Sequence, residues 1–312
     1  MPAVEQNRLA IALNIEPGEG GRLALLWTQS FVIGIALVSF YAASSALFLS
    51  AYGSDKLPHM YIAAAIVSAL FGLSYARFTK RNSPSSILIG TSVAMLIMVV
   101  GLRISIDTAD GIWPSLLLRA CYPLLQAMLA VLLWDLAGRM FDVRQGKRLF
   151  GLISAGEQLA TVLGGVSTPI LVAFLGTPNF LFLSVAALGL NLLVTVVIVR
   201  HYGERFGMAA AIEQENVEDS DRVLDLFRSR YVASIFLLSL LMMTVYHLVD
   251  FMFYEQARLR YSDQNALTNF FGLYQGVSQA ATFLVITVVT GRFISRFGIK
   301  VGMRVRPLAM LV

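Results

Sequence analysis

Long apolar runs separated by short polar segments dominate the chain. A helix needs about 20 apolar residues to cross a hydrocarbon layer of about 30 Å. Runs of this length predict eight membrane-spanning helices, at 24–51, 60–77, 85–104, 112–138, 149–175, 178–199, 231–255 and 267–290. A ninth run begins at about Arg306 and the chain stops inside it, so we expect a second helical bundle that is incomplete.

The amino-acid composition agrees with a membrane protein. Residues of the set AVILMFWYC make up 57% of the chain and charged residues only 14%, whereas a soluble domain has about 25% charged residues. The net charge of +5 does not indicate a nucleic-acid partner, because cytoplasmic loops of membrane proteins are enriched in Lys and Arg. The lone Cys121 and the scattered histidines have no metal-site spacing. We therefore expect no enzyme activity, no metal and no cofactor.

The distribution of cations among the loops predicts the orientation of the chain. Lys and Arg are enriched in every second connection, which places these loops and the N-terminus in the cytoplasm. The connections after spans two, four, six and eight carry Arg77, Lys80 and Arg81, then Arg139, Arg144, Lys147 and Arg148, then Arg200, Arg205, Arg222, Arg228 and Arg230, then Arg292, Arg296, Lys300 and Arg304.

The longest hydrophilic segment follows the sixth span and divides the chain. Two sets of spans around a long cytoplasmic linker are typical of two-bundle transporters. We predict an all-α multi-pass protein with a two-bundle transporter fold, the first bundle complete and the second partial. Its parts would be a cytoplasmic tail at 1–22, a six-helix bundle at 23–200, a linker with an amphipathic helix at 201–230, and the start of a second bundle at 231–312.

Two charged residues lie deep inside predicted spans. A charge at the bilayer centre costs about 2.5–3.5 kcal/mol on insertion scales and therefore needs a reason. At about 1.5 Å per residue, Arg119 in span four and Glu157 in span five reach similar depths from opposite sides. We expect them to pair. The pair could fix helix packing, or it could face a water-filled path and handle a charged substrate.

Further polar residues interrupt the apolar faces of other spans. His247 and Asp250 are three residues apart in span seven and share a helix face, although Asp250 could also be a solvated rim carboxylate. Interhelical hydrogen bonds explain most intramembrane amides, and Gln126 and Gln275 are candidates for either role. The predicted substrate path comprises Arg119, Gln126, Glu157, His247, Asp250 and Gln275.

Several segments carry a family resemblance. "KRLFGLISAGEQLATVLGG" (147–165) resembles the start of span five in the ATP/ADP translocases of plastids and intracellular bacteria. The similarity continues in "LVDFMFYEQA" (248–257), "LTNFFGLYQGVSQA" (267–280) and "TGRFISRFGIKVGMRVRPLAML" (290–311). The resemblance implies an antiporter with a major-facilitator-like fold of twelve spans that works by alternating access.

The chain also departs from the translocase pattern at positions where the family has charges. The stretch "FLS" ends at Ser50 where the family has lysine, Gln145 stands in place of a glutamate, and Tyr254 aligns with another lysine. Losing cations weakens phosphate recognition, which depends on Lys and Arg. The basic pair Lys147 and Arg148 matches the family, so we assign Gln145, Lys147 and Arg148 to a cytoplasmic mouth that anchors span five or attracts anions.

Two functions follow from these patterns. The first is a secondary transporter of a nucleotide or other small organic anion, with ATP and ADP as candidates, in a lipid bilayer that we expect to be a bacterial inner membrane. The alternative is a transporter-fold protein that no longer transports and serves as a membrane anchor or sensor for a soluble domain, attached or associated beyond the C-terminus. A packed interior without a polar cavity would favour the alternative.

Overall fold

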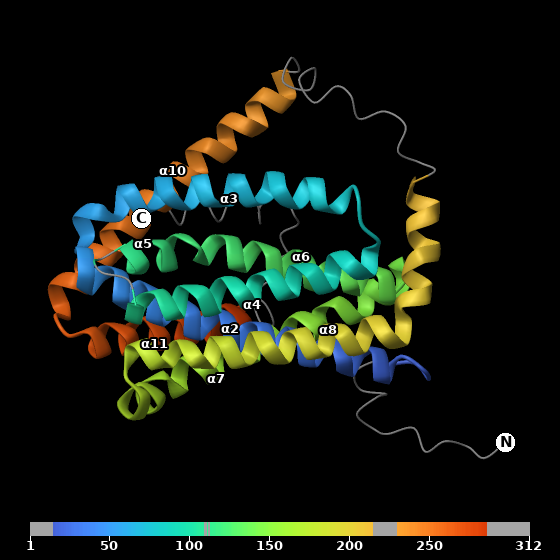
Figure 1. The fold of residues 1–312 in the computed structure, drawn as a ribbon, viewed down its shortest axis with the longest axis horizontal. Helices are drawn as coiled ribbons and strands as arrows, with labels where there is room; N and C mark the ends of the chain where they lie inside the picture. The colour runs from blue at the N-terminus through green and yellow to red at the C-terminus, as the bar shows by residue number, and fades with distance from the viewer. Residues whose placement is uncertain (1–14, 109–110, 112, 215–229, 286–312) are drawn as a thin grey trace.

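The described part of the chain is a bundle of long helices (Figure 1). A computed structural model describes residues 15–108, 111, 113–214 and 230–285, with the side chains of 147 and 204–214 excepted. The elements are α2 (Gly20–Tyr52), the 3-10 turn η1 (Ser54–Lys56), α3 (Leu57–Thr79), α4 (Pro84–Thr108), α5 (Trp113–Ala120), α6 (Tyr122–Met140), α7 (Val143–Leu175), α8 (Thr177–Gln214), α10 (Arg230–Arg260) and α11 (Gln264–Leu284).

The helices agree with the predicted spans. Within the described residues, seven helical stretches are long and apolar enough to cross a membrane, α5 and α6 together forming one of them. The eighth predicted span corresponds to α11. The ninth lies outside the described residues, as do the proposed amphipathic helix of the linker and most of the N-terminal tail.

Helix α2 occupies the centre of the bundle. It packs against α5, α6, α7, α8 and α11, and nearly every residue from Val32 to Leu49 is buried. A helix that is apolar on all sides is buried on all sides. The opposite case is α3, where Ile62, Ile66 and Leu70 form one stripe with exposed fractions of 54–62%. This stripe has the helical spacing of a lipid-facing surface.

The fourth predicted span is interrupted. Cys121 separates α5 from α6, and Pro123 follows in the first turn of α6. Proline has no N–H, so the carbonyl of Arg119 has no donor at the position four residues on, and such a site bends a helix. The interruption lies beside Arg119, the charged residue that the sequence singled out.

Helix α7 begins six residues before the predicted start of span five. Asp142 caps it: the carboxylate accepts hydrogen bonds from the backbone N–H groups of Arg144 (2.9 Å) and Gln145 (2.8 Å), and the Gln145 side chain accepts one from the Asp142 N–H. This capping box adds a polar first turn to the apolar helix. The helix ends at Leu175 because Gly176 takes a φ of 73°, which favours glycine.

Close helix crossings join α7 to its two neighbours. A Cβ added to Gly34 of α2 would lie 2.6 Å from the carbonyl oxygen of Glu157. A Cβ added to Gly165 of α7 would overlap the carbonyl oxygen of Gly272 and lie 2.7 Å from the Cα of Gly276 on α11. Small residues at four-residue spacing let membrane helices approach this closely.

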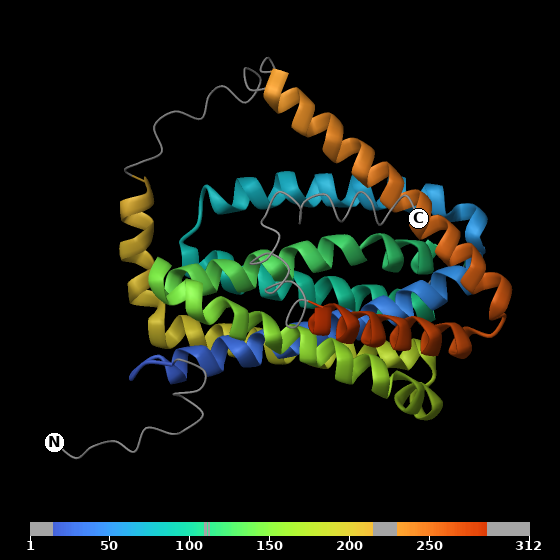
Figure 2. The ribbon, with the colours of Figure 1, turned by 180° about the vertical axis from the view of Figure 1, so that it is seen from behind.

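Helix α10 meets the rest of the protein at one end. Figures 1 and 2 show its N-terminal end standing away from α3 and its C-terminal end lying beside η1 and α11. Only Tyr254 and Ala257 of α10 are buried. The apolar residues of its N-terminal half therefore face outward on all sides. Helix α8 continues to Gln214, so the first part of the predicted linker extends span six as a helix.

Candidate substrate cavity

A cavity of about 680 Å³ with both polar and apolar lining residues lies between the first bundle and the helices α10 and α11. Its volume is in the range of small-molecule sites. Side chains from α2, α3, α5, α6, α10 and α11 line it: Tyr41, Met60, Tyr61, Ala64, Ala65, Ser68, Arg119, Tyr122, Pro123, Gln126, Met243, Tyr246, His247, Val249, Asp250, Phe253, Tyr274 and Gln275. We call this space the central cavity.

Arg119 of α5 forms one wall of the central cavity. Its guanidinium Nη2 donates a hydrogen bond to the hydroxyl of Tyr254 (2.7 Å), which lies 3.0 Å from the Ser45 Oγ. A tyrosine hydroxyl that accepts from arginine can use its own proton to donate to serine. The guanidinium carbon lies 5.6, 5.2 and 5.4 Å from the ring centroids of Tyr41, Tyr122 and Tyr254. These contacts are within cation–π distance.

The charge of Arg119 has no carboxylate partner. Among the described residues no Asp or Glu oxygen lies within 4.0 Å of it, and its Nε is buried without a hydrogen-bond acceptor. Arg119 itself is only 6% exposed. A buried cation is normally paired or bound to a ligand. This wall therefore presents to the cavity a positive charge that forms no ion pair with a described carboxylate.

A second polar group joins the two bundles across the central cavity. The hydroxyl of Tyr61 on α3 donates a hydrogen bond to the Asp250 carboxylate on α10 at 2.7 Å. The ring of His247 lies edge-on to Tyr61, with centroids 4.6 Å apart. Asp250 is half-buried in this contact, so its carboxylate is hydrogen-bonded and also borders the central cavity.

A family model described as Major Facilitator Superfamily matches residues 23–312, which is almost the whole chain. The chain belongs to the major facilitator superfamily. It is therefore a secondary transporter with the expected fold, and not an enzyme. Membership implies a small-molecule substrate and a lipid bilayer. Comparison with curated proteins and with solved structures finds no match.

The structure brings five of the six predicted path residues of this major facilitator superfamily member together. Arg119, Gln126, His247, Asp250 and Gln275 all line the central cavity, although they come from α5, α6, α10 and α11. The intramembrane polar positions thus converge on one space between the bundles.

Glu157 lies elsewhere, and its predicted pairing with Arg119 is wrong. No ion pair joins the two residues, and Glu157 does not line the central cavity. The backbone N–H of Glu157 donates to the Ser30 Oγ of α2 at 3.0 Å, and its carbonyl accepts from Thr161 at 2.9 Å. Glu157 therefore sits at the close crossing of α7 with α2, with a half-buried side chain.

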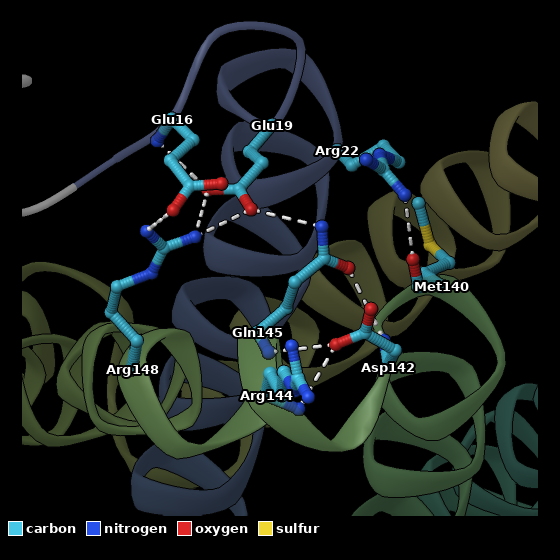
Figure 3. A network of polar contacts seen from close by, with 8 residues as sticks. All are labelled: Glu16, Glu19, Arg22, Met140, Asp142, Arg144, Gln145 and Arg148. Carbon is cyan, nitrogen blue, oxygen red and sulfur yellow. Dashed lines mark hydrogen bonds and ion pairs between the residues drawn. The ribbon is translucent and has the colours of Figure 1, made fainter.

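The predicted cytoplasmic mouth is a compact polar junction between the N-terminal segment and α7 (Figure 3). Arg148 binds Glu16 (2.5 Å) and both carboxylate oxygens of Glu19 (2.6 and 2.7 Å). The Gln145 amide donates to Glu19 at 2.9 Å. We call these four residues the N-terminal junction. Lys147 lies between two of them in sequence, and its side chain is outside the described part.

The N-terminal junction leaves Arg148 little charge to offer an anion. Glu19 is 2% exposed and takes hydrogen bonds from Arg148, Gln145 and the backbone N–H of Glu16 (2.9 Å). Nearby, Arg22 donates to the Met140 carbonyl at 2.8 Å (Figure 3). Of the two roles weighed for Arg148, anchoring α7 has the direct structural support.

The sequence reasoning did not single out Tyr41, Tyr61 or Tyr122, and it named Tyr254 only as the residue that aligns with a family lysine. Tyr41, Tyr122 and Tyr254 surround Arg119, and Tyr61 binds Asp250. A signal was present, because buried tyrosine hydroxyls normally have a hydrogen-bond partner and all four lie inside apolar spans.

The described residues contain no group of three or more His, Cys, Asp or Glu that could hold a metal ion.

Proposed function

We propose that the chain carries a small organic anion across the membrane by alternating access through the central cavity, with Arg119 as the anion-binding residue. The observation that carries the proposal is a buried guanidinium that has no carboxylate partner among the described residues and that lines a cavity between two bundles. Nucleotides are one class of organic anion, and the resemblance to ATP/ADP translocases makes ATP and ADP the first to test. The cavity also favours transport over the anchor or sensor function.

The contacts between bundles support alternating access. On one side α7 and α11 cross at Gly165, Gly272 and Gly276. On the other side the hydrogen bond from Tyr61 to Asp250 joins α3 to α10. A substrate that binds one arrangement of the bundles better than the other shifts the population toward it. In the proposed orientation the N-terminus is cytoplasmic, so the Tyr61–Asp250 contact lies nearer the outer side.

Uptake by the full-length protein in proteoliposomes tests the proposal. The assay follows labelled ATP, ADP and a panel of labelled organic anions, with and without the same solute inside the vesicles. Arg119→Gln should reduce transport at least about 100-fold, because it removes a charge-assisted contact in a low dielectric. Stimulation by internal solute would show exchange.

The matched control is Arg103→Gln. Arg103 is as buried as Arg119 (6%), but it is bound to Asp107 (2.6 Å) and Asn179 (2.9 Å) and does not line the central cavity. This variant should lose stability and keep its transport rate per folded molecule. Equal loss of transport in the two variants would refute the role of Arg119, and a folded protein that moves no anion would refute the function.

A further inference from the structure

The charged residues of the central cavity limit the charge of the substrate that it can hold. Among its described lining residues, Arg119 is the one Lys or Arg and Asp250 is the one carboxylate. The formal charges of Arg119 and Asp250 sum to zero. A bound monoanion would leave one net negative charge. A nucleoside triphosphate would leave several, close to Asp250 and inside a low dielectric where repulsion is strong.

The hydrogen-bonding capacity at Arg119 points to one anionic head group. Two faces of a planar guanidinium can take aromatic rings, and here Tyr41, Tyr122 and Tyr254 all lie within 5.6 Å of its central carbon. One Nη already donates to Tyr254. What remains for a ligand is the edge of a single guanidinium, which matches one carboxylate. A chain of phosphates needs several such donors.

Aromatic side chains form much of the remaining wall. Tyr61, Tyr246, Phe253 and Tyr274 line the central cavity in addition to the rings around Arg119. Phe253 and Tyr274, from α10 and α11, lie 4.5 Å apart between centroids. Flat ligands stack on or meet the edges of such rings at similar separations. The body of the substrate should therefore be planar and apolar.

We infer that the central cavity selects an aromatic monocarboxylate, with its carboxylate on Arg119 and its ring against the tyrosines, and that it rejects polyphosphates. This inference rests on the proposed function, since it names the class of organic anion that the proposed carrier takes.

Ligand binding to the purified full-length protein in lipid nanodiscs tests the inference by calorimetry. The probe is 2-naphthoate, and each comparison compound removes one feature: 2-naphthamide lacks the charge, decahydronaphthalene-2-carboxylate lacks the flat ring, naphthyl phosphate replaces the carboxylate by a phosphate head, and ATP adds charge. We expect 2-naphthoate to bind about 3- to 10-fold more tightly than the saturated acid. This ratio corresponds to the free energy that one or two aromatic contacts contribute. The amide and ATP should not bind measurably.

Two variants connect the preference to the cavity. Tyr246→Leu removes a lining ring that is 58% exposed, so the protein should fold, and the preference for 2-naphthoate over the saturated acid should shrink. Arg119→Lys keeps the charge and loses the paired donors, and it should weaken 2-naphthoate at least about tenfold.

Each contrary result refutes a specific part of the inference or of the proposed function. Tighter binding of ATP than of 2-naphthoate would refute the inference and leave the proposed anion carrier standing. Tighter binding of naphthyl phosphate would refute the carboxylate head, and equal binding of the saturated acid would refute the aromatic body. If no probe binds while proteoliposomes still exchange another anion, the inference alone fails. If neither binding nor exchange occurs, the proposed function fails as well.

Discussion

Removing the guanidinium of Arg148 would leave a buried carboxylate without its main partner. In the N-terminal junction, Arg148 contacts both oxygens of Glu19 at 2.6 and 2.7 Å, and Glu19 is 2% exposed. Breaking a buried ion pair from one side destabilises a protein by about 3–5 kcal/mol. Glu19 would keep the hydrogen bonds from Gln145 and the Glu16 N–H. We therefore expect Arg148→Met to cost about 2–3 kcal/mol, below that range.

The second half of this prediction concerns the double variant. Glu19→Gln in the Arg148→Met background removes the unpaired charge, so it should restore part of the stability. We expect the double variant to be more stable than the sum of the two single changes predicts, by at least about 1.5 kcal/mol. An exposed ion pair would give a coupling of about 0–1 kcal/mol.

The assay is equilibrium unfolding of the purified protein in mixed detergent micelles, for the wild type, both single variants and the double variant. Arg144→Met is the matched control, because Arg144 is an exposed cation in the same helical turn and forms no ion pair within the described residues. It should change the free energy of unfolding by less than about 0.5 kcal/mol. Strictly additive single changes would refute the claim that the junction is a buried, coupled pair.

Two further predictions concern α7. Gly165→Ala should destabilise the protein by several kcal/mol (about 2–4, as for overpacked sites), because its Cβ meets the Gly272 carbonyl. Gly151→Ala, with open space around the added Cβ, should be neutral or stabilise by up to about 1 kcal/mol. Thermal unfolding of the two variants measures this difference. Equal effects would contradict the close crossing of α7 and α11. Glu157→Gln should leave transport within about twofold of wild type in the proteoliposome assay, since Glu157 lies outside the central cavity. A loss of transport as large as that expected for Arg119→Gln would show that Glu157 belongs to the substrate path.

The spans were predictable because hydrocarbon imposes a length and a composition on any helix that crosses it. Their ends were less predictable, because they depend on local polar contacts. Helix α7 begins at Val143 because of a capping box formed by Asp142 and Gln145. The pattern Asp-x-x-Gln was present in the sequence, but the apolar run alone placed the start at 149.

The candidate site was predictable in its members and less so in their pairings. Arg119 and Asp250 were found because charges in a membrane need a reason, and both line the central cavity. The predicted partner of Arg119, Glu157, was wrong because depth along a helix does not give the direction in which a side chain points. Glu157 has a suitable depth, but its part of α7 faces α2. Tyr254, the true partner, lies 135 residues away on α10.

The two kinds of contact between the bundles differ in how readily they can change. At the α7–α11 crossing the backbones touch through glycines and Thr168, and in the proposed cycle the helices would tilt about this point while staying in contact. The Tyr61–Asp250 contact is a single hydrogen bond to a carboxylate, worth about 1.5–3 kcal/mol. Differential binding of a substrate supplies free energies of this size. Because Asp250 and Arg119 line the same cavity, an anion bound at Arg119 in the proposed cycle would lie in the same space as the contact that must break. The proposed carrier would thus pivot at the glycines and open at Tyr61, and its substrate would control the opening.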